Sequence, residues 1–144
     1  MTTISAEEFY KATLELAEKV KEFRPEILVP VMNGGMVPAA ILGEVLKIKD
    51  VRPISIFRKG DERELVYDLH GDISGKRVLV VEDAIPSDRG AGFRLAKKIF
   101  AERGAIVKTA SSFSGTNNSV DYYGARIEHG VHLFWKPSDR LDRF

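Results

Sequence analysis

Two adjacent carboxylates at the end of a strand-like run are the strongest chemical signal in the sequence. Glu82 and Asp83 follow an apolar run that begins at Arg77, and they precede a loop of small residues that leads into a helix-like segment. Such a pair can accept hydrogen bonds from two neighbouring hydroxyl groups, or it can hold Mg²⁺. The alternative interpretation is an acidic pair that only favours the dipole of the following helix.

The loop after these acids has the position of an anion-binding loop. It offers the hydroxyl group of Ser87, the guanidinium group of Arg89 and the backbone N–H groups of residues 88–91 at the start of a helix, where anions bind readily. Asp88 opposes this interpretation, because a carboxylate among these N–H groups repels an anion unless it points outward as an N-terminal helix acid.

A second turn of interest is Asn33-Gly34-Gly35, between an apolar run and a helix-like segment. Two adjacent glycines permit unusual backbone dihedrals and allow N–H groups to turn toward one anion at a helix start. A tight turn that binds no ligand is an equally simple alternative.

Two further groups are candidates for contacts with a substrate. Phe134 and Trp135 near the C-terminus are able to cover a flat base, and for Trp135 we expect a ligand-facing position rather than core packing. The charged stretch 58–63, which begins with Arg58 and Lys59, is either a mobile flap that closes over an anionic substrate or a solvated surface loop.

The pattern of apolar residues predicts the elements that position these groups. Ser5 and Glu8 have the spacing of a capping box at the start of a first helix. The alternation of strands and helices that follows predicts right-handed βαβ crossovers and a parallel sheet with helices on both faces. Ligands bind at the carboxyl ends of the strands of such sheets, where both turns are expected. The predicted strands are 26–32, 51–57, 77–83, 105–113, 121–127 and 131–135, the predicted helices are 36–46 and 91–104, and residues 64–72 are expected to form a short hairpin arm.

Composition narrows the class of protein. A chain of 144 residues is most economically one domain, spanning residues 1–144. With 22 basic and 21 acidic residues, it has no general excess of charge for nucleic acid. The sequence contains no cysteine, which excludes a cysteine nucleophile and thiolate metal sites. No run approaches the length of a membrane span, and the N-terminus has no signal-peptide pattern, so we expect a cytoplasmic location without membrane partners.

The ordered set of motifs resembles the type I phosphoribosyltransferases. The set comprises the strand–NGG–helix turn, the charged stretch, "GKRVLVVED" with its loop and helix, and "DYYG…KPSD" near the C-terminus. It is most similar to the branch that acts on 6-oxopurines in purine salvage, the xanthine-guanine and hypoxanthine phosphoribosyltransferases. The resemblance implies a Rossmann-like parallel core with a small C-terminal hood, phosphoribosyl pyrophosphate (PRPP) as co-substrate, Mg²⁺ as cofactor, and a homodimer or higher homo-oligomer.

The resemblance also assigns roles to individual residues. It implies that the glycine turn binds pyrophosphate, that the acid pair holds the ribose hydroxyl groups together with Mg²⁺, and that the following loop binds the 5-phosphate. It further implies an aromatic residue that stacks on the base and a late aspartate near a second Mg²⁺. In this sequence the pyrophosphate turn is Asn33, Gly34 and Gly35, and the acid pair is Glu82 and Asp83. The 5-phosphate loop is Ser87, Asp88, Arg89, Gly90 and Ala91. The base-stacking aromatic residue lies within Leu133 to Trp135, and the late aspartate is Asp139.

The sequence departs from the family pattern at several of these positions. Pro86 replaces the aspartate regarded as the proton acceptor for the purine, and a proline cannot accept a proton. Asp88 stands where glycine is expected, and Gly90 stands in place of the second threonine. The lysine that reads the purine 6-oxygen is absent from residues 110–114, and Lys108 is the nearest candidate.

Three functions are therefore compared. The first is an enzyme that transfers a phosphoribosyl group from PRPP to a nucleobase, with a purine favoured and with Asp88 in place of the missing aspartate. The second is an enzyme of the same fold that acts on a different base or ribosyl ligand. The third is a PRPP- or nucleotide-binding protein without catalysis. We rank them in this order.

Overall fold

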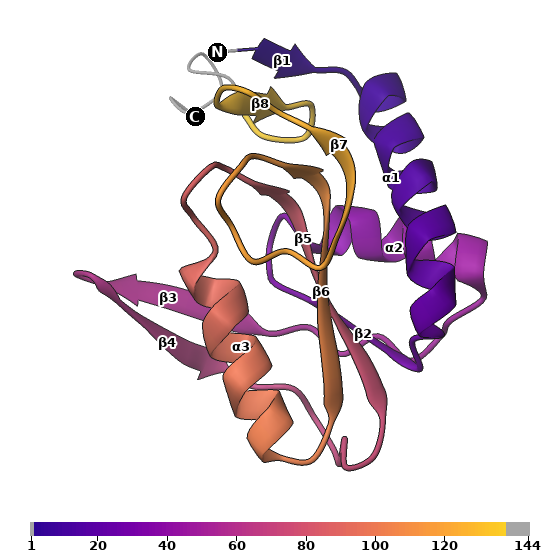
Figure 1. Ribbon diagram of the computed structural model, residues 1–144, viewed down its shortest axis with the longest axis vertical. Coiled ribbons are helices and arrows are strands. Elements are labelled where there is room, and N and C mark those ends of the chain that lie inside the picture. Colours follow the sequence, from indigo (N-terminus) through magenta and orange to yellow (C-terminus); the bar gives the residue numbers. More distant parts are fainter. Residues whose placement is uncertain (1, 138–144) are drawn as a thin grey trace.

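The computed structural model describes residues 2–137 (Figure 1). Strands and helices alternate along most of this range. In chain order the elements are β1 (Thr2–Ile4), α1 (Ala6–Val20), a 3₁₀ turn (Lys21–Phe23), β2 (Ile27–Pro30), α2 (Met36–Leu46), β3 (Ser55–Lys59), β4 (Glu62–Tyr67), β5 (Arg77–Ile85), α3 (Ala91–Glu102), β6 (Ile106–Ser114), β7 (Tyr122–Arg126) and β8 (Val131–Leu133).

A parallel four-stranded sheet in the order β2-β5-β6-β7 forms the centre of the molecule. The middle strand β5 carries a continuous apolar run, and the other middle strand, β6, is buried over most of its length, because both faces of the sheet are covered by helices. Helices α1 and α2 pack on one face and α3 on the other, as Figure 1 shows. The predicted parallel sheet with helices on both faces is confirmed.

The helices begin and pack as their sequences indicate. The predicted capping box is present, since the Ser5 hydroxyl group accepts a hydrogen bond from the N–H group of Glu8 and the Glu8 carboxylate accepts one from the N–H group of Ser5. Helix α3 buries Phe93, Ala96 and Phe100 against the sheet. Among residues 2–137, no helix is both long and apolar enough to cross a membrane.

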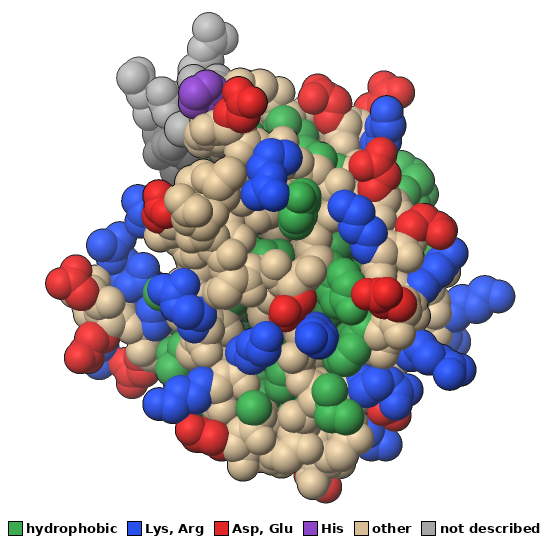
Figure 2. Space-filling model, in the orientation of Figure 1, with side chains coloured by type: hydrophobic (Ala, Val, Ile, Leu, Met, Phe, Trp, Pro, Cys, Tyr) green, Lys and Arg blue, Asp and Glu red, His purple; other side chains and the backbone are tan. Residues whose placement is uncertain are grey.

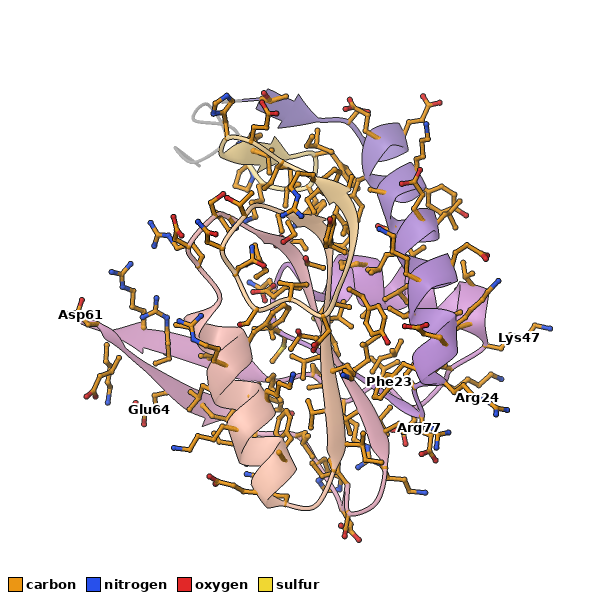
Figure 3. All side chains as sticks on the ribbon, viewed as in Figure 1. Phe23, Arg24, Lys47, Asp61, Glu64 and Arg77 are labelled. Atoms are coloured by element: carbon orange, nitrogen blue, oxygen red, sulfur yellow. The ribbon has the colours of Figure 1, made fainter. Side chains whose placement is uncertain are left out.

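The segment after the first βα unit differs from the prediction. Val51 pairs with Leu28 of β2 and Ile54 pairs with Val31 just after β2, each through an isolated bridge, and the chain then leaves the sheet. The expected charged loop 58–63 belongs instead to an antiparallel hairpin of β3 and β4, with Asp61 at its tip (Figure 3). Burial alternates along β4, where Arg63 and Leu65 are half-buried between exposed residues and Leu65 packs against the core, as in a strand with one face toward the protein.

Both ends of the described chain contribute to the hood. Strand β1 pairs in parallel with β8, and the two lie together at the top of Figure 1. An N-terminal strand was not expected. Ile4 and Leu133 are buried in one apolar cluster with Phe9 of α1 and Phe113 of β6, which fixes the hood to the carboxyl end of the sheet.

The opposite end of the sheet is closed by polar contacts. The guanidinium group of Arg77, at the start of β5, donates to the carbonyl oxygen of Arg24 at 2.7 Å and lies 3.3 Å from the Glu26 carboxylate. Arg24 and Arg77 lie side by side at the lower right of Figure 3. The open face for a ligand is therefore at the carboxyl ends of the strands.

Candidate functional site

The acid pair lies inside β5, because this strand continues to Ile85 rather than ending at Asp83. Successive side chains of a strand point to opposite faces. Glu82 accordingly lines a cleft beside the start of α3, whereas Asp83 lies on the other side against Gly34. Glu82 therefore belongs to the cleft beside α3, and Asp83 belongs to the adjoining glycine turn.

Asp83 is a buried carboxylate with an unsatisfied oxygen atom. Its exposed fraction is 6%. Oδ1 accepts a hydrogen bond from the N–H group of Ala84 at 2.6 Å, while Oδ2 has no hydrogen-bond partner among the described residues. Lys136 Nζ lies 3.8 Å from Oδ2. Burial raises the pKa of Asp83, and the charge of Lys136 opposes this shift.

The glycine turn between β2 and α2 is in direct contact with these groups. A Cβ atom at Gly34 would overlap the Asp83 carboxylate, and one at Gly35 would overlap the carbonyl oxygen of Val81. Close approach is therefore what requires glycine here. The N–H group of Gly35 donates to the Val31 carbonyl oxygen at 2.9 Å, so within the described chain only the N–H groups of Asn33 and Gly34 in this turn have no partner.

The loop that follows β5 is held from the side by the β6–β7 loop. The N–H group of Arg89 donates to the Pro86 carbonyl oxygen at 3.2 Å and closes a turn in which Asp88 has a left-handed conformation, with φ of 58°. The N–H group of Asp88 donates to the Thr116 carbonyl oxygen, and the Ser87 hydroxyl group accepts from the N–H group of Thr116 at 2.9 Å. Two of the donors predicted to hold a phosphate, the N–H groups of Asp88 and Arg89, therefore already have partners within the protein.

The remaining donors lie at the N-terminus of α3, which opens onto a cleft of about 740 Å³. The N–H groups of Gly90, Ala91 and Gly92 have no partner in the part of the chain that the structure describes. Unpaired N–H groups at a helix start attract anions.

Three arginines line the same cleft: Arg63 from β4, Arg89 from the loop and Arg94 from α3. None of them forms an ion pair with another described residue. Figure 2 shows Lys and Arg side chains gathered at the left, over the β3–β4 hairpin and the neighbouring start of α3. The cleft therefore suits a ligand with negative charge.

The residues predicted on the hairpin, Arg58 and Lys59, do not line this cleft. Arg58 donates to the carbonyl oxygen of Gly60 at 3.0 Å, and Lys59 forms an ion pair of 2.8 Å with Glu64. The arginine of this hairpin that lines the cleft is Arg63, across the ladder from Arg58. Arg63 can be identified only from the pairing of β3 with β4, which the sequence alone does not show.

Glu82 is partly buried at the floor of the cleft. Burial raises its pKa to about 8, and the neighbouring carboxylate of Asp83 contributes in the same direction. Ser111 lies beside Glu82 in the ladder, and its buried hydroxyl oxygen has no partner among the described residues. Ser111 is fully buried and does not line the cleft, so Glu82 is the group of this pair that a ligand hydroxyl group can reach.

Trp135 is partly buried and packs against the apolar cluster of the hood, where we expected a ligand-facing position. The centroid of its ring lies 4.6 Å from that of the Phe9 ring, in an edge-to-face arrangement, and the neighbouring Leu133 is buried. Phe134 is 46% exposed and is the aromatic residue of this segment with an accessible face. Asp139, expected near a second Mg²⁺, lies outside the described residues.

Lys108 is not near the site. It lies close to the N-terminal end of β6, whereas the site is built on the carboxyl ends of the strands. Lys136 is the lysine that lies beside the site, 3.8 Å from Asp83 Oδ2, and no periodicity or spacing in the sequence indicates this position.

Of Glu82 and Asp83, only Asp83 is suited to bind a metal ion. In residues 2–137, no three His, Cys, Asp or Glu side chains come together as a metal site. The unsatisfied Asp83 Oδ2 nevertheless has the chemistry of a Mg²⁺ ligand, since Mg²⁺ commonly binds one or two carboxylates together with water and ligand phosphates. Glu82 points to the other face of the strand and does not join Asp83 in one coordination shell.

The described fold is similar to that of known phosphoribosyltransferases. No family model and no curated protein matches the sequence. A purine phosphoribosyltransferase from Pyrococcus horikoshii is 26% identical with a TM-score of 0.86, and the match covers 95% of this chain and 94% of that chain. A hypoxanthine-guanine phosphoribosyltransferase from Bacillus anthracis is 27% identical with a TM-score of 0.72, covering 88% and 82%. A xanthine-guanine-hypoxanthine phosphoribosyltransferase from Helicobacter pylori is 24% identical with a TM-score of 0.78, covering 93% and 90%. The chain has the fold of these enzymes.

Proposed function

We propose that this protein is a phosphoribosyltransferase that transfers the phosphoribosyl group of PRPP to a nucleobase, with a purine favoured, and releases pyrophosphate. The observation that carries the proposal is the contact between Gly34 and Asp83, which joins the glycine turn to a buried carboxylate at the carboxyl end of the sheet. The arginine-lined cleft beside Glu82 and the similarity to purine phosphoribosyltransferases support it.

The site offers a separate contact for each part of PRPP. The N–H groups of Asn33 and Gly34 would bind the pyrophosphate group. Glu82 and Asp83 would accept hydrogen bonds from the ribose hydroxyl groups. The 5-phosphate would lie at the N-terminus of α3, close to the arginines of the cleft.

Catalysis in this arrangement is mainly electrostatic. Departure of pyrophosphate leaves positive charge on the ribose, and the carboxylate of Asp83, together with that of Glu82 when it is ionised, would stabilise that charge. Mg²⁺, when bound through Asp83, supplies further neutralisation of the pyrophosphate oxygens. The glycine turn holds the leaving group in place through backbone N–H groups, which need no reorganisation during the reaction.

Proton removal from the base requires a carboxylate, and Pro86 cannot provide one. Asp88 lines the cleft two residues later, on an exposed part of the loop. We assign the proton acceptor to Asp88, and Phe134 to the aromatic contact with the base.

A second candidate is an enzyme or binding protein of this fold for a different ribosyl ligand. It is favoured by the internal hydrogen bonds that the N–H groups of Asp88 and Arg89 donate, which leave fewer donors for a 5-phosphate than the sequence predicts. Calorimetric titration of PRPP with Mg²⁺ separates the two candidates, since absence of heat at millimolar PRPP contradicts a PRPP site. Release of pyrophosphate with a panel of purines and pyrimidines then separates an enzyme from a binding protein.

A further inference from the structure

Asp83 is more deeply buried than is usual for a carboxylate that binds a cation. It is almost completely buried, and its Oδ2 atom lacks a hydrogen-bond partner among the described residues. The cation that lies beside this atom is Lys136 Nζ, at 3.8 Å. A buried carboxylate is costly unless a positive charge or a donor compensates it. In the ligand-free protein, Lys136 provides that compensation.

The position of Lys136 is set by the hood. The segment before it pairs with β1 through β8, and the Trp135 ring packs against Phe9 of α1. The N–H group of Lys136 donates to the carbonyl oxygen of Leu133 at 3.0 Å, which turns the chain over the site. The side chain of Lys136 is 53% exposed, whereas that of Asp83 is 8% exposed. The lysine therefore approaches the carboxylate from the solvent side and is free to leave it.

We propose that Lys136 is the resident counter-ion of Asp83 and competes with a divalent cation for its Oδ2 atom. The inference rests on the proposed function, because it concerns the carboxylate assigned there to the ribose and the metal. Two positive charges cannot share one buried oxygen atom without strong repulsion, so cation binding requires the ammonium group to move away. Lys136 acts through Asp83 and lowers the affinity of the site for a divalent cation before any substrate is bound.

The test is the affinity for Mn²⁺ alone, measured on the full chain by electron paramagnetic resonance of the free ion, at pH 8 to favour the ionised form of Asp83. The variant Lys136→Met removes the competing charge and keeps the apolar stem. We expect it to bind Mn²⁺ about tenfold more tightly than the natural protein, after allowance for screening of the exposed ammonium group. Adding Asp83→Asn to Lys136→Met is expected to abolish this gain.

The chain offers a matched control. Lys76 Nζ also lies 3.8 Å from a carboxylate, that of Glu26, and its side chain is 52% exposed, but it is at the opposite end of the sheet. Lys76→Met is expected to leave Mn²⁺ affinity unchanged. Thermal unfolding of each variant by circular dichroism checks that the fold is intact.

Three results overturn the inference: equal or weaker Mn²⁺ affinity in Lys136→Met, a gain that persists when Asp83 is replaced, or absence of a Mn²⁺ site in every variant. These results are distinguishable from failure of the proposed function. A protein that forms nucleotide from PRPP while Lys136→Met leaves Mn²⁺ affinity unchanged contradicts only the role of Lys136. A protein that shows the expected gain but forms no nucleotide contradicts only the proposed function.

Discussion

Gly34 lies so close to Asp83 that a single additional carbon atom on the glycine would overlap the carboxylate. The turn after β2 and the middle of the sheet are thereby fixed relative to each other. A ligand that binds both the turn and the carboxylate must have two polar groups separated by a short distance, as a ribosyl pyrophosphate has.

The first prediction follows from this contact. Gly34→Ala should displace the Asp83 carboxylate, weaken PRPP binding by more than tenfold and destabilise the fold by about 2 kcal/mol, because the added methyl group has no room. Calorimetry and urea unfolding measure the two effects. Gly75→Ala is the control, since a Cβ atom there meets no neighbour, although φ is +73°. It should cost about 1 kcal/mol through backbone strain and leave PRPP affinity intact.

The second prediction concerns Asp83 itself. Asp83→Asn keeps the shape of the side chain and removes its charge, so we expect PRPP binding in the presence of Mg²⁺ to be abolished while the protein stays folded. Unchanged affinity in a calorimetric titration would contradict the assignment of Asp83 to the ribose and the metal.

The third prediction concerns the pH dependence of stability. The pKa of Glu82 is raised from 4.5 to about 8 in the folded protein, so between these values the folded state holds a proton that the unfolded state has released. The free energy of unfolding should therefore fall as the pH rises through this window, on the order of 2 kcal/mol after screening. Glu82→Gln should show a smaller fall, because the pKa of Asp83 is also raised by burial and contributes in the same direction. Parallel urea titrations of both proteins at pH 5 and pH 8.5 measure the difference, and identical pH dependence would contradict the burial of this group.

Much of the fold could be predicted from local patterns, while parts of the site could not. The capping box at Ser5 and the buried run of β5 are local features, and both were predicted correctly. Residues 58–63 were predicted as a loop, because they form an almost continuous charged run without apolar periodicity, but they belong to the ends of β3 and β4 and the turn between them. Trp135 was placed toward the ligand, because its packing partner Phe9 is distant in sequence and no spacing rule connects them.

The same limit applies to the arginines of the cleft. Arg94 lies within a helix and Arg63 within a strand, and each would pass for a solvated surface residue. They line one cleft because the β3–β4 hairpin lies next to the start of α3. Tertiary packing of this kind leaves no periodic signal in the sequence.

The fourth prediction tests this cleft. Arg63→Met should weaken PRPP binding by about tenfold and reduce its dependence on salt, because one charged contact with an anion is lost. Arg58→Met is the matched control, since Arg58 lies directly across the hairpin and does not line the cleft. A larger effect of Arg58→Met than of Arg63→Met in calorimetric titrations would reverse this assignment.

The fifth prediction concerns the loop after β5. If the position of the acceptor, at Asp88 rather than at residue 86, limits the rate, Pro86→Asp should increase transfer to a purine, whereas Pro86→Asn, whose side chain has the size of Asp but no basic carboxylate, should not. Steady-state release of pyrophosphate measures both. Equal rates in the two variants would show that the position of the acceptor is not limiting.

The most direct test of the central claim is PRPP-dependent release of pyrophosphate in the presence of Mg²⁺ and a purine base, measured for the natural protein and for Asp83→Asn. We predict release that requires both PRPP and the base and that Asp83→Asn abolishes. Absence of release with every purine and pyrimidine tested, from a protein that is folded, would contradict the assignment of this chain as a phosphoribosyltransferase.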